Sequence, residues 1–312
     1  MTRFSIIIIH RNNSKRLQSL LSNIKKIKGQ NDEIIVIDNN SPDNSGLKAA
    51  KNIRNSDIKF ILNNCNAGYG YSCNQGMNIA KGKYYLLCNN DIKLKKETLE
   101  KFECSFQKSK DVGLIGPQMF SPDGNKMRSY GSRNPSFISQ FDIVGRPIET
   151  KKINSFSQVP ILRGACLAVN RDMIKEVGSY DEDFYFYHEE TEWCIRINKS
   201  KNWKVFFNPE IHISHVGGGS TNSVFAHSRI EFLRSRLQFW YKLFPRYQFL
   251  LLVSWNIPKL FLDFLFYLIA TLSTLGIVKS YKKKLIDRSA VILWLILGMP
   301  KSWGLPDKCN QK

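Results

Sequence analysis

The sequence predicts an α/β protein whose mostly parallel sheet carries helices on both faces. Short apolar, β-branched runs at residues 5–10 and 33–38 are typical of strands that are buried on both sides. Residues 14–27 lie between these runs and have apolar side chains at helical spacing. Strands that alternate with helices form βαβ units, which pair their strands in parallel.

The remaining elements follow the same pattern. Strands are expected at residues 59–62 and 84–88, with a helical, Gly- and Asn-rich stretch between them. Residues 111–160 are richer in Gly, Pro and Ser and are expected to include loops. A strand at 161–169, a helix at 171–177 and an acidic, aromatic block around residues 184–193 come next.

Polar residues follow each of the first four strands, at 10–13, 38–40, 63–66 and 89–91. In open α/β sheets the ligand binds outside the carboxyl ends of the strands. These four segments therefore predict one shared site.

The chain has 312 residues, 43% of them hydrophobic, and a net charge of +20 from 46 basic and 26 acidic residues. This composition excludes a disordered chain, and the charge indicates an anionic partner. Residues 227–312 hold 14 of the basic and 4 of the acidic residues, and also the longest apolar runs. Basic and apolar residues together favour an anionic membrane surface over nucleic acid. A globular domain at 1–225 and a helical, membrane-associating region at 226–312 are therefore expected.

The uncharged stretches of the C-terminal region, residues 247–258, 264–278 and 289–300, are each shorter than the roughly 20 residues of a membrane-spanning helix. They predict helices that lie on the membrane, peripheral or monotopic. An i,i+4 pair of Lys259 and Asp263 could join the first two stretches into one helix that contains Pro258. A membrane-spanning helix is therefore the second interpretation. A buried helical hairpin is the third interpretation.

The seven cysteines are scattered and include no Cys-x-x-Cys pair. Neither a zinc site nor a disulfide framework is expected, and a reducing cytoplasm fits this pattern. The isoleucine run after Arg3 is interpreted as a first strand and not as a signal peptide.

Three of the polar segments suggest chemistry, each with a structural alternative. Asp38 could accept hydrogen bonds from a nucleotide, or it could cap a turn. Backbone amides of the glycine-rich turn at 66–76 could meet a diphosphate, although the turn is no Walker loop. Asp91 could hold a divalent metal, or it could be part of a polar loop.

Glu189, Glu190 and Glu192 crowd the start of an expected helix, behind four aromatic residues. A carboxylate near apolar rings could act as a general base, and the alternative is a solvated helix start that complements the helix dipole. His212 and His215 precede a glycine run, and His215 is the better ligand candidate.

Taken in chain order, these motifs resemble the inverting family-2 glycosyltransferases of GT-A fold, especially the rhamnosyltransferase-like branch of bacterial surface-polysaccharide synthesis. The resemblance covers roughly residues 4–220. Its motifs lie at residues 9–12, 37–43, 66–76, 88–91, 164–182 and 189–196, and at Pro209, His215, Gly218 and Ser220. The chain departs from the family at Asn89, which replaces a carboxylate, and at Glu190, where many relatives have Asp.

The resemblance implies a role for each matching residue. Glu190 would be the catalytic base, and Asp91 and His215 would hold Mg²⁺ or Mn²⁺. Gly164, Glu189 and Trp193 would lie on the acceptor side. The nucleotide-diphosphate sugar would be bound by His10, Asn12, Asp38, Asn40, Asn66, Gly68, Asn74 and Asn90.

The implied reaction moves a sugar, from dTDP-rhamnose or a UDP-hexose, to a polyprenyl-diphosphate-linked glycan in O-antigen, capsule or cell-wall synthesis. It would take place on the cytoplasmic face of the inner membrane. Two alternatives stay open, a non-catalytic nucleotide- or glycan-binding module and a sugar nucleotidyltransferase. The chain lacks the Gly-x-Gly-Thr-Arg loop that a sugar nucleotidyltransferase is expected to have after its first strand.

Overall fold

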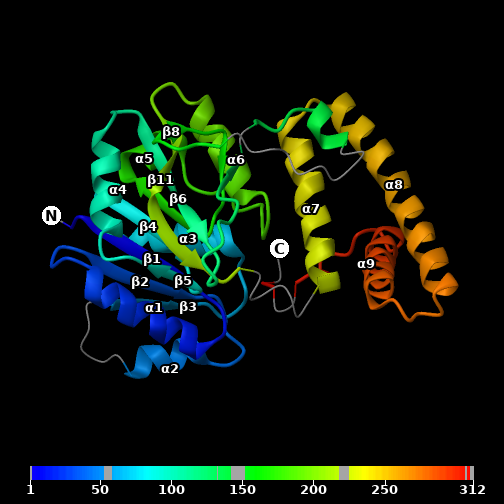
Figure 1. Cartoon of the computed structure of the whole chain (residues 1–312), viewed down its shortest axis with the longest axis horizontal. Helices are drawn as coiled ribbons and strands as arrows, with labels where there is room; N and C mark the ends of the chain where they lie inside the picture. The colour runs from blue at the N-terminus through cyan, green and yellow to red at the C-terminus, as the bar shows by residue number, and fades with distance from the viewer. Residues whose placement is uncertain are drawn as a thin grey trace. The chain divides into compact units, whose positions relative to one another are not determined.

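Figure 1 shows the computed structural model, which describes residues 2–52, 58–131, 133–141, 152–217, 225–305 and 308–309. The chain divides into two compact units. The first, the sheet unit, consists of Met1–Asn134, Ile148–Tyr185 and Glu189–Gly219. The second, the helical unit, consists of Pro135–Pro147, Phe186–His188 and Ser220–Lys312.

The sheet unit is built on a sheet with strand order β3-β2-β1-β4-β10-β6-β11-β5, to which β8 adds by pairing with β11. β1 (Phe4–His10) lies between β2 (Glu33–Asp38) and β4 (Tyr84–Asn89), and β3 (Ile58–Leu62) pairs with β2. All four strands are parallel, which confirms the expected βαβ arrangement. Their carboxyl ends therefore meet at one edge of the sheet.

Helices cover both faces of this sheet because its central strands are apolar on both sides (Figure 1). In β1, Ile6 and Ile8 pack in the core on one face, and Ile7 and Ile9 pack in the core on the other. The first core also holds side chains from α1 (Ser14–Ile27), α2 (Ser45–Asn52) and α4 (Thr98–Gln107). The second holds side chains from α3 (Tyr69–Ile79), α5 (Arg171–Val177) and α6 (Glu189–Lys199).

The middle of the sheet unit departs from the sequence prediction. The strand expected at 161–169 is two strands, β9 (Ile161–Leu162) and β10 (Cys166–Asn170), because β9 leaves the large sheet and pairs with β7 (Tyr130–Gly131). β10 runs antiparallel between β4 and β6 (Val112–Phe120). β6 lies within residues 111–160, the region that was expected to include loops. β8 (Ser157–Gln158) lies in the same region, and so does the 3-10 helix η1 (Ile138–Phe141), which belongs to the helical unit.

β11 (Lys204–His215) and β5 (Ile92–Leu94) complete the sheet. They pair antiparallel, with His215 opposite Ile92. The end of β11 is therefore next to the segment that follows β4.

The helical unit contains α7 (Phe225–Leu243), α8 (Arg246–Ser273) and α9 (Lys279–Ile296). α8 runs through Pro258 and joins two of the expected apolar stretches into one helix of 28 residues, about 42 Å long. Asp263 on α8 lies 3.9 Å from Arg288 on α9. Among the described helices, α8 alone is long and apolar enough to cross a membrane, and only 6% of its most apolar window is buried.

Candidate active site

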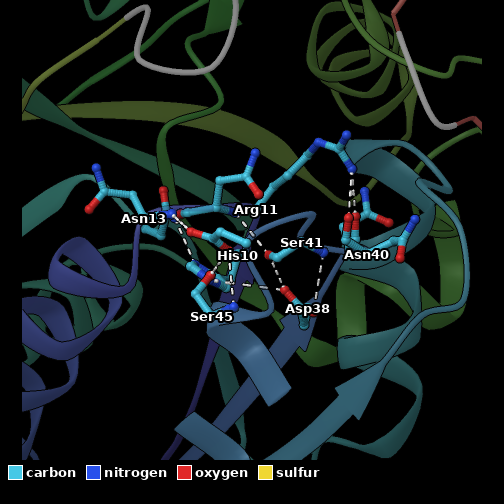
Figure 2. Close-up of polar contacts among 11 residues, drawn as sticks. His10, Arg11, Asn13, Asp38, Asn40, Ser41 and Ser45 are labelled. Atoms are coloured by element: carbon cyan, nitrogen blue, oxygen red, sulfur yellow. Dashed lines mark hydrogen bonds and ion pairs between the residues drawn. The ribbon is translucent and has the colours of Figure 1, made fainter. Parts of the chain in front are cut away.

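The loops after β1 and β2 meet at the carboxyl edge of the sheet, where His10 is in register with Asp38 (Figure 2). Asn12, Asn13 and Asn40 adopt positive φ angles of 59°, 72° and 56°. Asparagine tolerates this left-handed conformation better than most residues do, so its repeated use here has a backbone reason. Asn13 also caps α1, since its side chain accepts a hydrogen bond from the Arg16 amide.

His10 lies inside this edge with no exposed surface, and both of its ring nitrogens have protein partners. Nδ1 lies 2.8 Å from the side-chain amide of Asn90, and Nε2 lies 2.7 Å from the hydroxyl of Ser45. Because the amide nitrogen of Asn90 can only donate, Nδ1 accepts and Nε2 carries the proton. His10 is therefore held through both of its ring contacts and orients Asn90, and its expected place among the donor-binding residues stays a prediction.

The Asn12 side chain is different, because its Oδ1 atom is buried and has no hydrogen-bond partner among the described residues. The backbone of Asn12 is fixed at both ends. Its amide donates to Ser41, and its carbonyl accepts from Asn90. A buried acceptor held in this way is suited to a donor group on a ligand, such as a ribose hydroxyl or a base N–H.

Asp38 is 5% exposed and accepts hydrogen bonds from both the backbone amide and the hydroxyl of Ser41. A Cβ added at Gly46 would lie 2.2 Å from the Asp38 carboxyl carbon, so only glycine fits there. The structure thus shows the turn-capping role that was the alternative for Asp38.

Arg11 is a site residue that the sequence analysis missed. Its Nη1 atom donates to the carbonyls of Asn39, at 2.9 Å, and Asn40, at 3.0 Å, and so joins the loops after β1 and β2 (Figure 2). The sequence could have indicated Arg11, because this arginine lies in the polar segment 10–13 that follows the first strand.

The glycine-rich turn after β3 serves mainly to hold its own backbone. Three of its amides have protein acceptors: that of Ala67 donates to Asn39, that of Gly68 to Asn66, and that of Tyr69 to the Tyr185 carbonyl. These three amides therefore bond within the protein, and the expected donor-binding role of Asn66 and Gly68 stays a prediction. Gly68 has φ of 93°, and a Cβ on it would lie 2.4 Å from the Tyr185 carbonyl oxygen.

Asn74 on α3 is also structural. It is 3% exposed, donates to the Tyr180 carbonyl and to Glu182, and accepts from the Tyr180 amide. It anchors the loop that precedes α6, and its expected donor-binding role stays a prediction.

Asp91 and His215 come together where β5 pairs with β11. His215 Nε2 lies 3.3 Å from Asp91 Oδ1, and the amide of Val216 donates to the Asp91 carbonyl. Burial alone would raise the pKa of Asp91, but the imidazole of His215 lowers it below the usual value for an aspartate. Gly218 and Ser220, which complete the His215 motif, lie outside the described residues.

This pair fits a divalent cation. Asp91 Oδ1 and His215 Nε2, an oxygen and a nitrogen of the kinds that bind divalent cations, face each other at 3.3 Å. His215 Nδ1 is buried and has no hydrogen-bond partner within the part of the chain that the structure describes. No third His, Cys, Asp or Glu joins them in that part of the chain. Mg²⁺ is commonly held by one or two carboxylates together with substrate phosphates, so two protein ligands are enough for such a site.

Glu190 stands in the first turn of α6, beside Gly164. A Cβ on Gly164 would lie 3.6 Å from the Cβ of Glu190, and the Gly164 carbonyl accepts from the Tyr69 hydroxyl at 2.7 Å. Burial raises the pKa of Glu190 above its usual value, and the charge of Arg163 acts in the opposite direction. A carboxylate whose pKa is raised by burial is suited to general-base chemistry near neutral pH.

The neighbours of Glu190 on α6 have other roles. Glu189 is 5% exposed, and burial and the nearby charge of Glu190 raise its pKa well above the usual value. Trp193 has no exposed surface and donates to the Gly178 carbonyl, so it belongs to the core and not to an acceptor surface. Glu192 pairs with Arg196 at 2.8 Å.

The sequence analysis missed Arg163, whose charge acts on Glu190, and its neighbour Arg128. Arg163 follows β9, and its amide donates to the Ser129 carbonyl, which places it next to Arg128. Both arginines are exposed, and burial together with the charge of Arg163 lowers the pKa of Arg128. Two like charges held side by side make an anion-binding pair.

Comparison with known proteins finds a family and several relatives. Residues 5–178, more than half of the chain, match the family described as Glycosyl transferase family 2. A low-salt glycan biosynthesis hexosyltransferase of Haloferax volcanii is 23% identical over 199 residues, which cover 62% of this chain and 61% of that protein. An N-acetylglucosaminyl-diphospho-decaprenol L-rhamnosyltransferase of Mycobacterium tuberculosis is 23% identical over 213 residues, 60% of this chain and 67% of that protein.

Solved structures share the fold. A mannosyltransferase of Pyrobaculum calidifontis, solved with GDP-Man and Mn²⁺, superposes with a TM-score of 0.54 at 14% identity and covers 94% of this chain and 86% of that one. GalNAc-T7, solved with UDP, GalNAc and Mn²⁺, superposes with a TM-score of 0.55 at 15% identity and covers 99% of this chain and 59% of that one.

Proposed function

The chain belongs to glycosyl transferase family 2, and from this premise we propose that it transfers one sugar from a nucleotide diphosphate to a hydroxyl of a lipid-linked glycan, with inversion. The observation that carries the proposal is the placement of Asp91 beside His215 at the carboxyl edge of the sheet. The hexosyl- and rhamnosyltransferases that the chain resembles support a hexose or rhamnose donor. Bacterial surface polysaccharide, as O-antigen, capsule or cell wall, is the proposed product.

On the donor side, Asn12 offers its buried acceptor atom to the nucleoside, and Arg11 and Asn40 line the neighbouring loop. Asp91 and His215 would hold Mg²⁺ or Mn²⁺, a choice supported by the Mn²⁺ in the two superposed transferases. When bound, the ion would neutralise the charge that develops on the departing diphosphate. The hydrogen bond between His10 and Asn90 holds these two side chains in position.

On the acceptor side, Glu190 removes the proton from the acceptor hydroxyl as that oxygen attacks the anomeric carbon. Attack from the face opposite the leaving diphosphate inverts the configuration in a single displacement, so one base is sufficient. Gly164 leaves room beside Glu190 because it has no side chain. Arg128 and Arg163 supply positive charge for the diphosphate of a polyprenyl-linked acceptor.

We assign the transferase chemistry to residues 1–225 and membrane attachment to residues 226–312. α8 exposes large apolar side chains, among them Leu250, Leu262 and Phe266 at 61%, 66% and 60%. An exposed apolar surface of this kind marks a membrane or protein contact. The exposed lysines of α9 would each gain roughly 1 kcal/mol at an anionic leaflet, which favours attachment to the cytoplasmic face.

One assay tests the proposal. The purified protein is incubated with a panel of nucleotide sugars and a polyprenyl-diphosphate-linked acceptor, with and without EDTA. We expect transfer from one donor class and its loss in excess EDTA. Binding of a nucleotide sugar without transfer or hydrolysis of any donor on the panel would instead indicate a non-catalytic binding module.

A further inference from the structure

The helical unit contains a pocket that the proposed reaction does not use. It lies between α7, α8 and α9 and has a volume of about 180 Å³. A dry cavity of about 150 Å³ is large enough to bind benzene, so this space can take a small headgroup. Apolar side chains such as Phe232, Trp240, Leu260 and Val291 form part of its lining.

The charged residues of the lining make the pocket positive. Arg229 and Arg236 come from α7, Lys259 from α8 and Arg288 from α9, and they face two acids, Asp263 and Asp287. Arg288 lies 3.9 Å from Asp263, and Arg236 donates to the Gln140 carbonyl. The lining still has two more basic residues than acids, and this surplus of positive charge favours an anion.

Asp287 adds a second requirement. It is 2% exposed, lines the pocket, and its Oδ2 atom has no hydrogen-bond partner among the residues that the structure describes. A buried carboxylate oxygen without a partner costs free energy, which a ligand that donates a hydrogen bond would recover. The pocket therefore matches a ligand that combines an anionic phosphate with a nearby hydroxyl group.

α8 indicates that this ligand is a lipid. Val253, Asn256, Leu260 and Asp263 follow helical spacing and face the pocket, whereas Leu262, Leu265 and Phe266 lie among the exposed positions of the same helix. A phosphate held in the pocket would thus be next to an apolar helix surface that acyl chains can cover.

We propose that the pocket between α7, α8 and α9 binds the headgroup of a phosphatidylglycerol-like lipid, with the phosphate on the basic residues and a headgroup hydroxyl on Asp287. The inference deepens the membrane attachment proposed above and rests on it. Bulk attraction to anionic lipid needs only surface charge, whereas this site also recognises the hydroxyl.

The test is vesicle flotation of the full chain at fixed salt, with phosphatidylcholine vesicles that contain equal fractions of phosphatidylglycerol or phosphatidylmethanol. Both lipids carry one negative charge, but only phosphatidylglycerol has headgroup hydroxyls. We expect about tenfold tighter binding to phosphatidylglycerol, the factor that corresponds to about 1.4 kcal/mol. Equal binding to the two vesicles would overturn the pocket assignment, and no binding to either would overturn membrane attachment itself.

Two variants locate the effect. Asp287→Ala should remove the preference for phosphatidylglycerol and keep binding to anionic vesicles, since it deletes a negative charge. Arg229→Ala with Lys259→Ala should remove the preference as well. The matched control, Lys279→Ala with Lys282→Ala, deletes two exposed charges of α9 outside the lining and should weaken binding to both vesicles equally.

A soluble competitor separates the lipid from a free phosphate ester. We expect millimolar sn-glycerol 3-phosphate to leave vesicle binding almost unchanged, because it lacks the acyl chains that cover α8. Full displacement by this compound would show that the pocket binds a soluble phosphate ester, and would overturn the lipid assignment. Far-UV circular dichroism checks that each variant is folded.

Discussion

The carboxylate of Asp91 lies 3.3 Å from the imidazole of His215, although the two residues are far apart in the sequence. The antiparallel pairing of β5 with β11 brings them together, because it sets His215 opposite Ile92. The two atoms that face each other are Asp91 Oδ1 and His215 Nε2, and both side chains are largely buried. The sheet topology thus places the two proposed metal ligands at the edge where the loops after β1 and β2 also lie.

The first prediction concerns this pair. Asp91→Ala is expected to abolish transfer, since it removes the only carboxylate of the pair, and His215→Ala is expected to raise the Mg²⁺ or Mn²⁺ concentration needed for half-maximal rate. Metal titration of the transfer rate measures both effects. His212→Ala is the control, because His212 lies on the same strand as His215 but packs against Phe120 of β6. The metal requirement of this variant should stay unchanged. Undiminished activity in excess EDTA contradicts the metal role of both residues.

Glu190→Gln is expected to lower the transfer rate by about 10²–10⁴, the usual cost of losing a general base, and to leave donor binding within a few-fold. Single-turnover transfer and nucleotide-sugar titration measure the two quantities. The matched control is Glu192→Gln, two positions along α6, whose carboxylate pairs with Arg196. Near-native turnover in Glu190→Gln would show that Glu190 is not the base and would indicate Glu189 or Glu192 instead.

The pH profile provides an independent test of Glu190. A base acts only when it is deprotonated, so the rate falls as the pH drops through its pKa. Because burial raises the pKa of Glu190, the acidic limb of kcat/KM should lie at higher pH than an ordinary glutamate would give. Arg163 lowers this pKa, and Arg163→Ala should therefore move the limb further up. Arg163→Lys, which keeps the charge, should leave it in place, and an unmoved limb in Arg163→Ala counts against this coupling.

Much of the fold was predictable because local patterns agree with it. Apolar runs at residues 5–10 and 33–38 became β1 and β2, and Leu17, Leu20, Leu21 and Ile24 are the buried face of α1 as expected. The break between β9 and β10 was not predictable, because Leu162 and Cys166 are both apolar and buried. Only the pairing of β9 with β7, a tertiary contact, ends the strand there.

The site was predictable at the level of which segments converge, and less so at the level of individual side chains. His10, Asn66 and Asn74 stand in the expected polar segments, but their polar atoms bond to other protein groups. A sequence pattern places a residue at a strand end, whereas the direction of its side chain depends on neighbours distant in the chain. Arg128 and Arg163 were missed for the same reason, since β7 and β9 bring them together.

Asp32 is expected to be a major source of stability in the sheet unit. It is 4% exposed and accepts hydrogen bonds from Arg3 and from the amides of Phe4 and Gly29. Asp32→Asn should lower the free energy of unfolding by about 1–3 kcal/mol, because the amide cannot accept all the hydrogen bonds that the buried carboxylate accepts, whereas Arg3 is partly exposed and keeps its pair with Glu103. Urea denaturation measures the change. Asp172→Asn, which breaks an exposed pair with Lys175, should cost at most about 1 kcal/mol.

The same residue predicts a pH dependence of stability. Burial raises the pKa of Asp32, but its hydrogen bonds, first those from Arg3, bring the pKa below the usual value. A lowered folded-state pKa means that the stabilisation is complete above the unfolded-state pKa and is lost as the pH falls through the folded one. The gap in stability between the native chain and Asp32→Asn should therefore narrow in acid. A gap that stays constant down to the acid-unfolded state would contradict this.

Fractionation of cells tests the membrane attachment of the helical unit. We expect the native chain in the membrane fraction at low salt and its release by high salt or carbonate, because the exposed lysines of α9 and the apolar surface of α8 act together. Leu262→Glu with Phe266→Glu adds charge to the exposed surface of α8 and should move the protein to the soluble fraction. Transfer to a soluble acceptor analogue checks that this variant is folded. Release of the native chain by detergent alone would instead favour α8 as a span, and a wholly soluble native chain at low salt would rule out attachment.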